Sequence, residues 1–221
     1  MGKVVHVTRT HLVWDWNGTL LNDFALVLSA TNHALSTVGG PAVTADHHRR
    51  HFIRPVADYY AMVLGRAVDA DEFDQLDEIF HDAYRAGLTT CALADDAVTA
   101  MRSWNGSQSL LSMWFHEDLV PAVTAFGLDG RFQRVDGVQV ALGGDRAFKA
   151  GHLARHVEAL GVDGGSVVLI GDSLDDADAA RSVGAGCVLY TGGFTDEGRL
   201  RASGHPVAGT LSEAVEIALT A

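Results

Sequence analysis

The sequence has few features of nucleic-acid-binding proteins. Its 16 lysines and arginines stand against 28 aspartates and glutamates, which gives a net charge of −12, and no basic cluster interrupts the acidic residues. Electrostatic attraction to the phosphate backbone is therefore missing. We expect no nucleic-acid partner.

Cysteines and long apolar runs are also scarce. Cys91 and Cys187 lie far apart without a CxxC pair, which argues against a disulfide scaffold or a zinc site and predicts two core thiols in a reducing compartment. No segment approaches the roughly 18 apolar residues of a membrane span, and no cationic head precedes an apolar run at the N-terminus. The expected location is cytoplasmic, without a membrane partner.

Short apolar runs recur along a chain in which 48% of the 221 residues are hydrophobic. We predict strands at residues 11–14, 108–113, 166–171 and 186–190, with helices at 116–126 and 149–160. Strands that alternate with helices are typical of a doubly wound parallel sheet. The sequence therefore predicts the α/β class with a Rossmann-like core.

Residues 22–93 break this alternation. Four helices are predicted there in succession, without a strand between them: residues 24–38, 45–52, 56–64 and 71–86. We therefore expect an all-helical insert at residues 22–93, placed within a core formed by residues 1–21 and 94–221.

The stretch WDWNGTLLND places Asp15 directly after the first predicted strand. Open parallel sheets bind ligands at the carboxyl ends of their strands, so an acid there is a candidate site residue. An Asn-Gly turn whose polar side chains only cap the next helix is the plain alternative.

A second acidic motif, GDSLDDADAA, follows the apolar run VVLI. Asp172 thus also lies at a strand end, and Asp176 follows one helical turn later. Carboxylates of this kind are suitable ligands for Mg²⁺. A calcium loop is disfavoured because Leu174 and Ala177 break its pattern, whereas helix capping by Asp172 or Ser173 is compatible with metal binding.

Two weaker signals are Ser112, at the end of a predicted strand, and Lys149, which opens a helix after the glycine-rich loop GGDRAF. The chain has only one other lysine, Lys3, against fourteen arginines. This usage favours a specific need for an ammonium, such as phosphate neutralisation. The alternative is a lysine solvated at the start of a helix.

In this order, the acid with NGT, Ser112, Lys149 and GDSLDDADAA resemble the four motifs of the haloacid dehalogenase-like hydrolase superfamily, most closely its phosphoglycolate-phosphatase-like branch. The resemblance spans the chain. It implies that residues 22–93 form a helical cap, and that the protein is a phosphatase that hydrolyses a small phosphorylated metabolite with Mg²⁺.

The resemblance also implies residue roles. Asp15 would attack phosphorus and form an aspartyl-phosphate. Mg²⁺ would be held by Asp15, the main-chain carbonyl of Asn17 and Asp172, with Asp176 supporting it through water or directly. The phosphoryl group would be held by Ser112, Lys149 and main-chain N–H groups near Trp16 to Gly18. Apart from the resemblance, we expect Arg54, just before Pro55, to contact the substrate from the cap.

Asn17 departs from the family pattern, which usually has a second aspartate there as general acid and base. An amide cannot exchange a proton, and such catalysis contributes about 10²- to 10⁴-fold. The open interpretations are another proton donor, a preference for good leaving groups, a weak or inactive relative that binds a phosphorylated ligand or partner, and an engineered replacement of a natural aspartate.

The candidates for another proton donor are Asp23 and three histidines near Arg54: His47, His48 and His51. We instead expect His47, His48 and their neighbouring arginines to form a solvated helix face.

Three other branches of the superfamily tolerate a non-acid at the position of Asn17, and each is disfavoured. Phosphonoacetaldehyde hydrolases need a cap lysine, which residues 22–93 lack. Metal-free dehalogenases lack the acidic fourth motif, and phosphoryl-transfer ATPases are membrane pumps.

Overall fold

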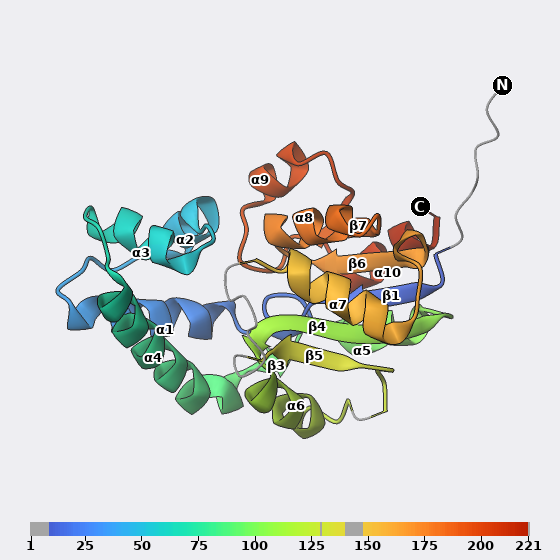
Figure 1. The fold of residues 1–221 in the computed structure, drawn as a ribbon, viewed down its shortest axis with the longest axis horizontal. Coiled ribbons are helices and arrows are strands. Elements are labelled where there is room, and N and C mark those ends of the chain that lie inside the picture. Colours follow the sequence, from blue (N-terminus) through green and yellow to red (C-terminus); the bar gives the residue numbers. More distant parts are fainter. Residues whose placement is uncertain (1–8, 129, 140–147, 221) are drawn as a thin grey trace.

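A six-stranded parallel sheet forms the centre of the protein (Figure 1). The computed structural model describes residues 9–128, 130–139 and 148–220. The strand order is β5-β4-β1-β6-β7-β8, with β1 His11–Trp14, β4 Ser107–Phe115, β5 Val135–Val138, β6 Val167–Gly171, β7 Gly186–Tyr190 and β8 Val207–Ala208. The predicted fold class is confirmed.

Helices cover both faces of this sheet. Side chains of successive residues point to opposite faces of a strand, so Leu12 and Trp14 of β1 join one buried cluster and Val13 joins another. The first cluster includes residues of α5 (Ala97–Ser103), α6 (His116–Ala125) and α10 (Leu211–Thr220). The second includes residues of α7 (Ala150–Leu160), α8 (Leu174–Ser182) and α9 (Glu197–Ala202).

Four helices lie beside one end of the sheet, on the left in Figure 1: α1 Phe24–Thr37, α2 Ala45–His51, α3 Val56–Leu64 and α4 Ala70–Gly87. Helices α1, α3 and α4 share a separate hydrophobic cluster that includes Leu35, Tyr60 and Leu76. A two-stranded antiparallel ribbon of β2 (Leu21–Asn22) and β3 (Ala92–Leu93) lies where the chain enters and leaves them. The predicted helices are therefore present, whereas the exact division into core and cap stays a prediction.

Several details differ from expectation. Strand β4 does not end at residue 113 but continues to Phe115, past a shift in its register with β5 after Leu111. His48 is not part of a solvated face, because its ring packs between Phe24, Phe52 and Tyr59 and is 1% exposed. The short elements β5, β8, α5, α9 and α10 and the β2–β3 ribbon were not predicted.

Both cysteines are free thiols. Cys187 is buried as predicted, but Cys91 is only half-buried. Apart from Phe148, the loop predicted before Lys149 lies outside the described residues, as does Lys3.

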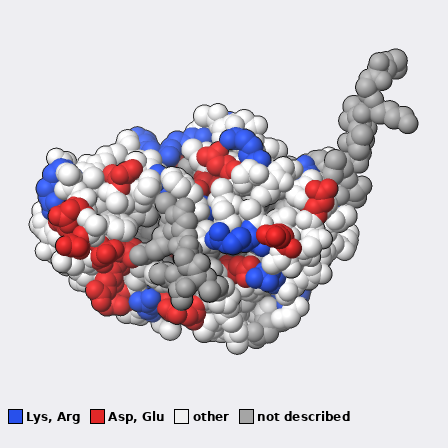
Figure 2. Space-filling model, in the orientation of Figure 1, with Lys and Arg blue, Asp and Glu red and all other residues white. Residues whose placement is uncertain are grey.

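Acidic and basic side chains of the described residues are intermingled on the face shown in Figure 2, where they form no broad basic area. Within the described part of the chain, no helix has both the length and the apolar character of a membrane span.

Candidate active site

Asp15 lies where strand β1 ends and a tight turn begins. Its main-chain N–H still donates to the carbonyl of Ile170 on β6, at 2.9 Å, so the backbone at Asp15 continues the sheet. Gly18 then takes a left-handed conformation with φ 72°. A Cβ on Gly18 would lie 2.7 Å from Oδ2 of Asp172, so the close approach of the turn to β6 requires glycine.

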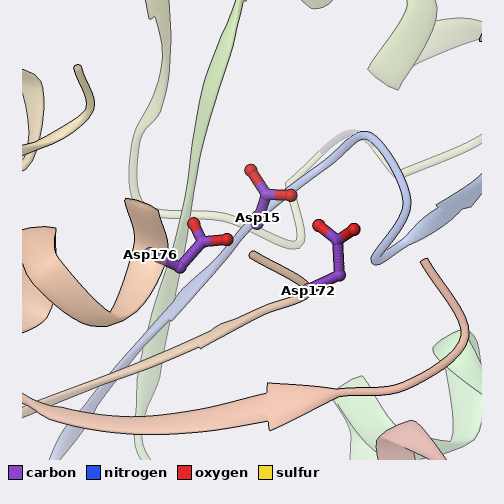
Figure 3. A group of neighbouring side chains, drawn as sticks. All are labelled: Asp15, Asp172 and Asp176. Atoms are coloured by element: carbon purple, nitrogen blue, oxygen red, sulfur yellow. The ribbon is translucent and has the colours of Figure 1, made fainter. Parts of the chain in front are cut away.

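Three carboxylates converge at this edge of the sheet (Figure 3). Asp15 follows β1, Asp172 follows β6, and Asp176 lies in the first turn of α8. One oxygen of each lies within 4.8 Å of the others. Their exposed fractions are 7%, 2% and 1%, so the three acids are held together away from solvent, as the sequence predicted.

Lys149 joins this group from the start of α7. Its Nζ donates to Oδ1 of Asp15 and, at 2.6 Å, to Oδ1 of Asp176. The side chain is 2% exposed, which excludes the alternative of a solvated helix-start lysine. With one ammonium and three carboxylates, the group carries a formal charge of −2.

This crowding of charge shifts the pKa of several groups. Burial raises the pKa of Asp15 to about 6, although Lys149 opposes the shift. Burial also raises the pKa of Asp172 well above its ordinary value, and the charges of Asp15 and Asp176 add to the effect. Burial alone would lower the pKa of Lys149, but the two carboxylates it contacts raise it. The site therefore favours an added positive charge.

Hydrogen bonds fix the orientation of the acids. Oδ2 of Asp176 accepts from the main-chain N–H and the hydroxyl of Ser173, which caps α8. Oδ2 of Asp172 accepts from the N–H of Phe194 at 2.6 Å. The hydroxyl of Thr19 lies 3.2 Å from Asp15 and 3.4 Å from Asp172. Helix capping and convergence of the acids thus occur together.

A cavity of about 430 Å³ opens above these acids, between the sheet and helices α1 to α4. The predicted site residues that line it are Asp15, Asn17, Arg54, Lys149, Asp172 and Asp176. Nε of Arg54 lies 3.7 Å from Oδ2 of Asp175, so the cavity joins the strand ends to the helical insert.

Two predicted residues do not line the cavity. Ser112 is fully buried. The N–H of Gly18 donates to the carbonyl of Leu21 at 3.1 Å and to Oδ1 of Asp23 at 2.8 Å. In this arrangement both residues support the turn, and their role in phosphate binding stays a prediction.

Comparisons with known proteins show what the sequence is similar to. A family described as HAD-hydrolase-like matches residues 148–214, the segment that carries Lys149, Asp172 and Asp176. A phosphoglycolate phosphatase of Mesorhizobium japonicum is 24% identical over 200 residues, 86% of each chain. One of Agrobacterium fabrum is 26% identical over 204 residues, 83% of this chain and 81% of the relative.

By these matches, the chain is similar to the haloacid dehalogenase-like hydrolase superfamily. Its fold is that of solved members: a haloacid dehalogenase-like family protein from Streptococcus pneumoniae superposes with a TM-score of 0.81 at 17% identity, and the match covers 95% of this chain and 98% of that one. The sequence relatives support a likeness to the phosphoglycolate-phosphatase-like branch.

Asn17, the departure from the superfamily pattern, is held at both ends of its amide. The hydroxyl of Ser112 donates to Oδ1 at 3.0 Å. Nδ2 donates to Oδ2 of Asp23 and to the hydroxyl of Tyr84, each at 2.8 Å. The amide is thus fixed beside Asp15 without a proton to exchange.

Asp23 lies directly behind this amide and is 1% exposed. Besides Asn17 it accepts hydrogen bonds from the hydroxyl of Tyr84 at 2.7 Å and from the N–H of Gly18. Burial raises its pKa. Because Asp23 does not line the cavity, it contacts Asn17 rather than the space a substrate would occupy.

The sequence interpretation missed Tyr84 and Thr19 as site residues. Thr19 belongs to the quoted WDWNGT motif, and its position four residues after Asp15 was the available signal. Tyr84 comes from α4, more than sixty residues along the chain, and no local pattern indicates that it reaches Asn17.

Proposed function

We propose that this chain is a Mg²⁺-dependent phosphohydrolase that acts on a small phosphorylated metabolite through an aspartyl-phosphate at Asp15. The observation that carries the proposal is the position of Asp15. It lies on the floor of a cavity, with Lys149 on one of its oxygens and Asp172 and Asp176 beside it.

The residues present fit a magnesium ion. Carboxylate oxygens are ligands that Mg²⁺ prefers, and a formal charge of −2 matches a divalent cation. Asp15 and Asp172 with the main-chain carbonyl of Asn17 would hold the ion, and Asp176 would support it, since its oxygens already accept from Lys149 and Ser173. When bound, the ion would neutralise charge on the phosphoryl oxygens.

The chain's own groups account for the reaction. An oxygen of Asp15 attacks phosphorus, the bond to the leaving oxygen breaks, and the phosphoryl group is transferred to the carboxylate. Lys149 lies where it balances charge on the transferred group, and the hydroxyl of Thr19 orients Asp15. Water then attacks phosphorus, which releases phosphate and restores the carboxylate.

The helices α1 to α4 serve as the cap in this proposal, with residues 22–93 as the cap and residues 1–21 and 94–221 as the catalytic core. Residues 22–93 supply the cavity wall that faces Asp15, including Arg54 and Tyr84. Selection of the substrate is therefore assigned to this wall. The relatives named phosphoglycolate phosphatase support a small phosphorylated substrate.

A weak or inactive relative that binds a phosphorylated ligand is the second candidate. The fixed amide of Asn17 is the observation that favours it, because neither protonation of the leaving oxygen nor activation of water by an acid at this position is available. The two candidates share the site and differ in turnover.

A phosphatase screen across metabolite classes, with Mg²⁺ and with EDTA, tests the proposal. The enzyme predicts phosphate release that needs Mg²⁺ and is lost in Asp15→Asn. Saturable ligand binding without phosphate release from any substrate would instead support the binding protein.

A further inference from the structure

The cavity has two ends of opposite chemistry. One end is the group of Lys149 with the three acids Asp15, Asp172 and Asp176. The rest of the wall is mainly apolar and aromatic, and includes Phe52, Tyr60, Phe73, Phe80, Trp114 and Phe115. A molecule held at Asp15 by its phosphate therefore places the remainder of its structure against rings.

Helix α4 gives this wall its length. Phe73, Asp77, Phe80 and Tyr84 all line the cavity, and their spacing of four, three and four residues places them along one face of the helix. Tyr84 at the near end contacts Asn17, and the ring of Phe80 stacks on that of Tyr84 with centroids 6.0 Å apart. The aromatic surface thus begins directly beside the catalytic end.

Charges on the cap side do not favour an acidic substrate. Among the described residues that line the cavity, Arg54 is the cap's arginine, and it lies beside Asp175. Nε2 of His81 lies 3.5 Å from Oδ1 of Asp77. The His48 ring accepts or donates a hydrogen bond with Tyr59, and burial lowers the pKa of His48 to about 4, so it is neutral. A substrate that carried a carboxylate besides its phosphate would bring that charge near Asp77 and Asp175.

The missing acid at Asn17 favours an aromatic substrate by an independent argument. Without an acid near the leaving oxygen, that oxygen departs as an anion. The pKa of a phenol-type hydroxyl is about 10, against about 15.7 for water, which is closer to an alcohol. Aryl esters therefore lose less than alkyl esters from the missing acid.

We propose that the preferred substrate is an aryl phosphate, a phosphate monoester of a phenol whose ring packs against the α4 face of the cavity. This proposal rests on the proposed function. The oxygen of Asp15 bonds to phosphorus, the bond between phosphorus and the aryl oxygen breaks, and its electron pair leaves on the phenolate, which takes a proton from water. A second water hydrolyses the aspartyl-phosphate.

Four substrates, assayed with the wild-type protein and Mg²⁺, distinguish the effect of the aromatic wall from the effect of the leaving group. Phenyl phosphate has the ring and the good leaving group, benzyl phosphate has the ring with an alkyl leaving group, and glycerol 3-phosphate and 2-phosphoglycolate have neither. We expect kcat/KM for phenyl phosphate to exceed that of the last two by about 10²-fold or more. Benzyl phosphate should show a lower KM than glycerol 3-phosphate.

The α4 face is tested with Phe80→Ala, with Phe73→Ala as a second variant in case the first does not fold. Either should raise the ratio of KM for phenyl phosphate to KM for acetyl phosphate about tenfold. Phe132→Ala, a half-buried phenylalanine outside the cavity wall, is the matched control and should leave this ratio unchanged.

Equal or higher kcat/KM for 2-phosphoglycolate or glycerol 3-phosphate would overturn the aryl preference and leave the phosphatase function standing. An unchanged KM ratio in folded wall variants would also overturn it. Absence of Mg²⁺-dependent turnover with every substrate, acetyl phosphate included, would overturn the phosphatase function as well.

Discussion

The side-chain amide of Asn17 donates to the buried carboxylate of Asp23 across 2.8 Å. This contact explains how the turn after Asp15 tolerates a buried acid that does not line the cavity. Two carboxylates at this distance would share a proton. Because residue 17 is an amide, no such pair forms beside Asp15.

Asn17→Asp should therefore create such a pair. Because Asp23 is buried and its pKa is already raised, the new carboxyl is expected to hold a proton near neutral pH. That proton is available to a leaving oxygen, so kcat for alkyl phosphates should rise, at most about 10²- to 10⁴-fold, and by less for aryl phosphates. The measurement is kcat for benzyl and phenyl phosphate.

The control for this change is the double variant Asn17→Asp/Asp23→Asn, which restores one amide and one acid with their positions exchanged. Equal effects on both substrates in the single variant, or no effect on either, would contradict this account of Asn17.

Asp172→Asn should stabilise the protein without metal and abolish its response to Mg²⁺. The raised pKa of Asp172 means that its native carboxylate is disfavoured at neutral pH relative to the unfolded chain, so a neutral amide removes a cost of folding. The melting temperature in EDTA should rise by a few degrees.

In the wild type, Mg²⁺ at about 100 times its Kd should add about 2.7 kcal/mol to the free energy of unfolding. That gain should be absent in Asp172→Asn. A full Mg²⁺ response in the variant would remove Asp172 from the metal site.

Activity should fall on the acidic side as Asp15 takes up a proton. The nucleophile must be ionised, and burial raises the pKa of Asp15 to about 6 in the absence of metal. At low Mg²⁺ the rate should therefore decrease about tenfold per pH unit below 6, and saturating Mg²⁺ should move this limb to lower pH. For this group alone, the free energy of unfolding changes in the opposite sense and increases as pH falls from 6 towards 4.

Profiles of kcat/KM at two Mg²⁺ concentrations measure this effect. An acidic limb at the same pH under both conditions would show that Asp15 and the metal do not interact.

Tyr84→Phe should lower the free energy of unfolding by about 1–3 kcal/mol, because it leaves the buried Asp23 without one of its donors. Denaturant unfolding measures the change. Tyr59→Phe is a matched control: it removes a hydroxyl that contacts His48 at 3.1 Å and no buried carboxylate, so its effect should be smaller. An effect of Tyr59→Phe as large as that of Tyr84→Phe would contradict the importance of the Asp23 contact.

The positions of Asp15 and Asp172 were predictable because each follows a short apolar run, and parallel strands end at the same edge of the sheet. Asp176 followed from helical spacing. The role of Lys149 was open in the sequence, since its burial depends on α7 packing beside the strand ends. The contacts of Tyr84 and His48 depend on how α2, α3 and α4 pack together, which local patterns do not determine.

The short elements were missed for a related reason. Strands β2, β3 and β8 have two residues each, too few for a periodic pattern, and they form through pairing with neighbours that are distant in sequence. The continuation of β4 to Phe115 likewise depends on a change of register with β5.

The most direct test of the central claim is mass spectrometry of the protein quenched during turnover of phenyl phosphate with Mg²⁺. Asn17 cannot activate water, so the aspartyl-phosphate should persist long enough to be trapped. We predict one phosphoryl group on the peptide that contains Asp15, absent with EDTA and in Asp15→Asn. Turnover with no phosphoryl group on Asp15, or with the group on another residue, would contradict the account.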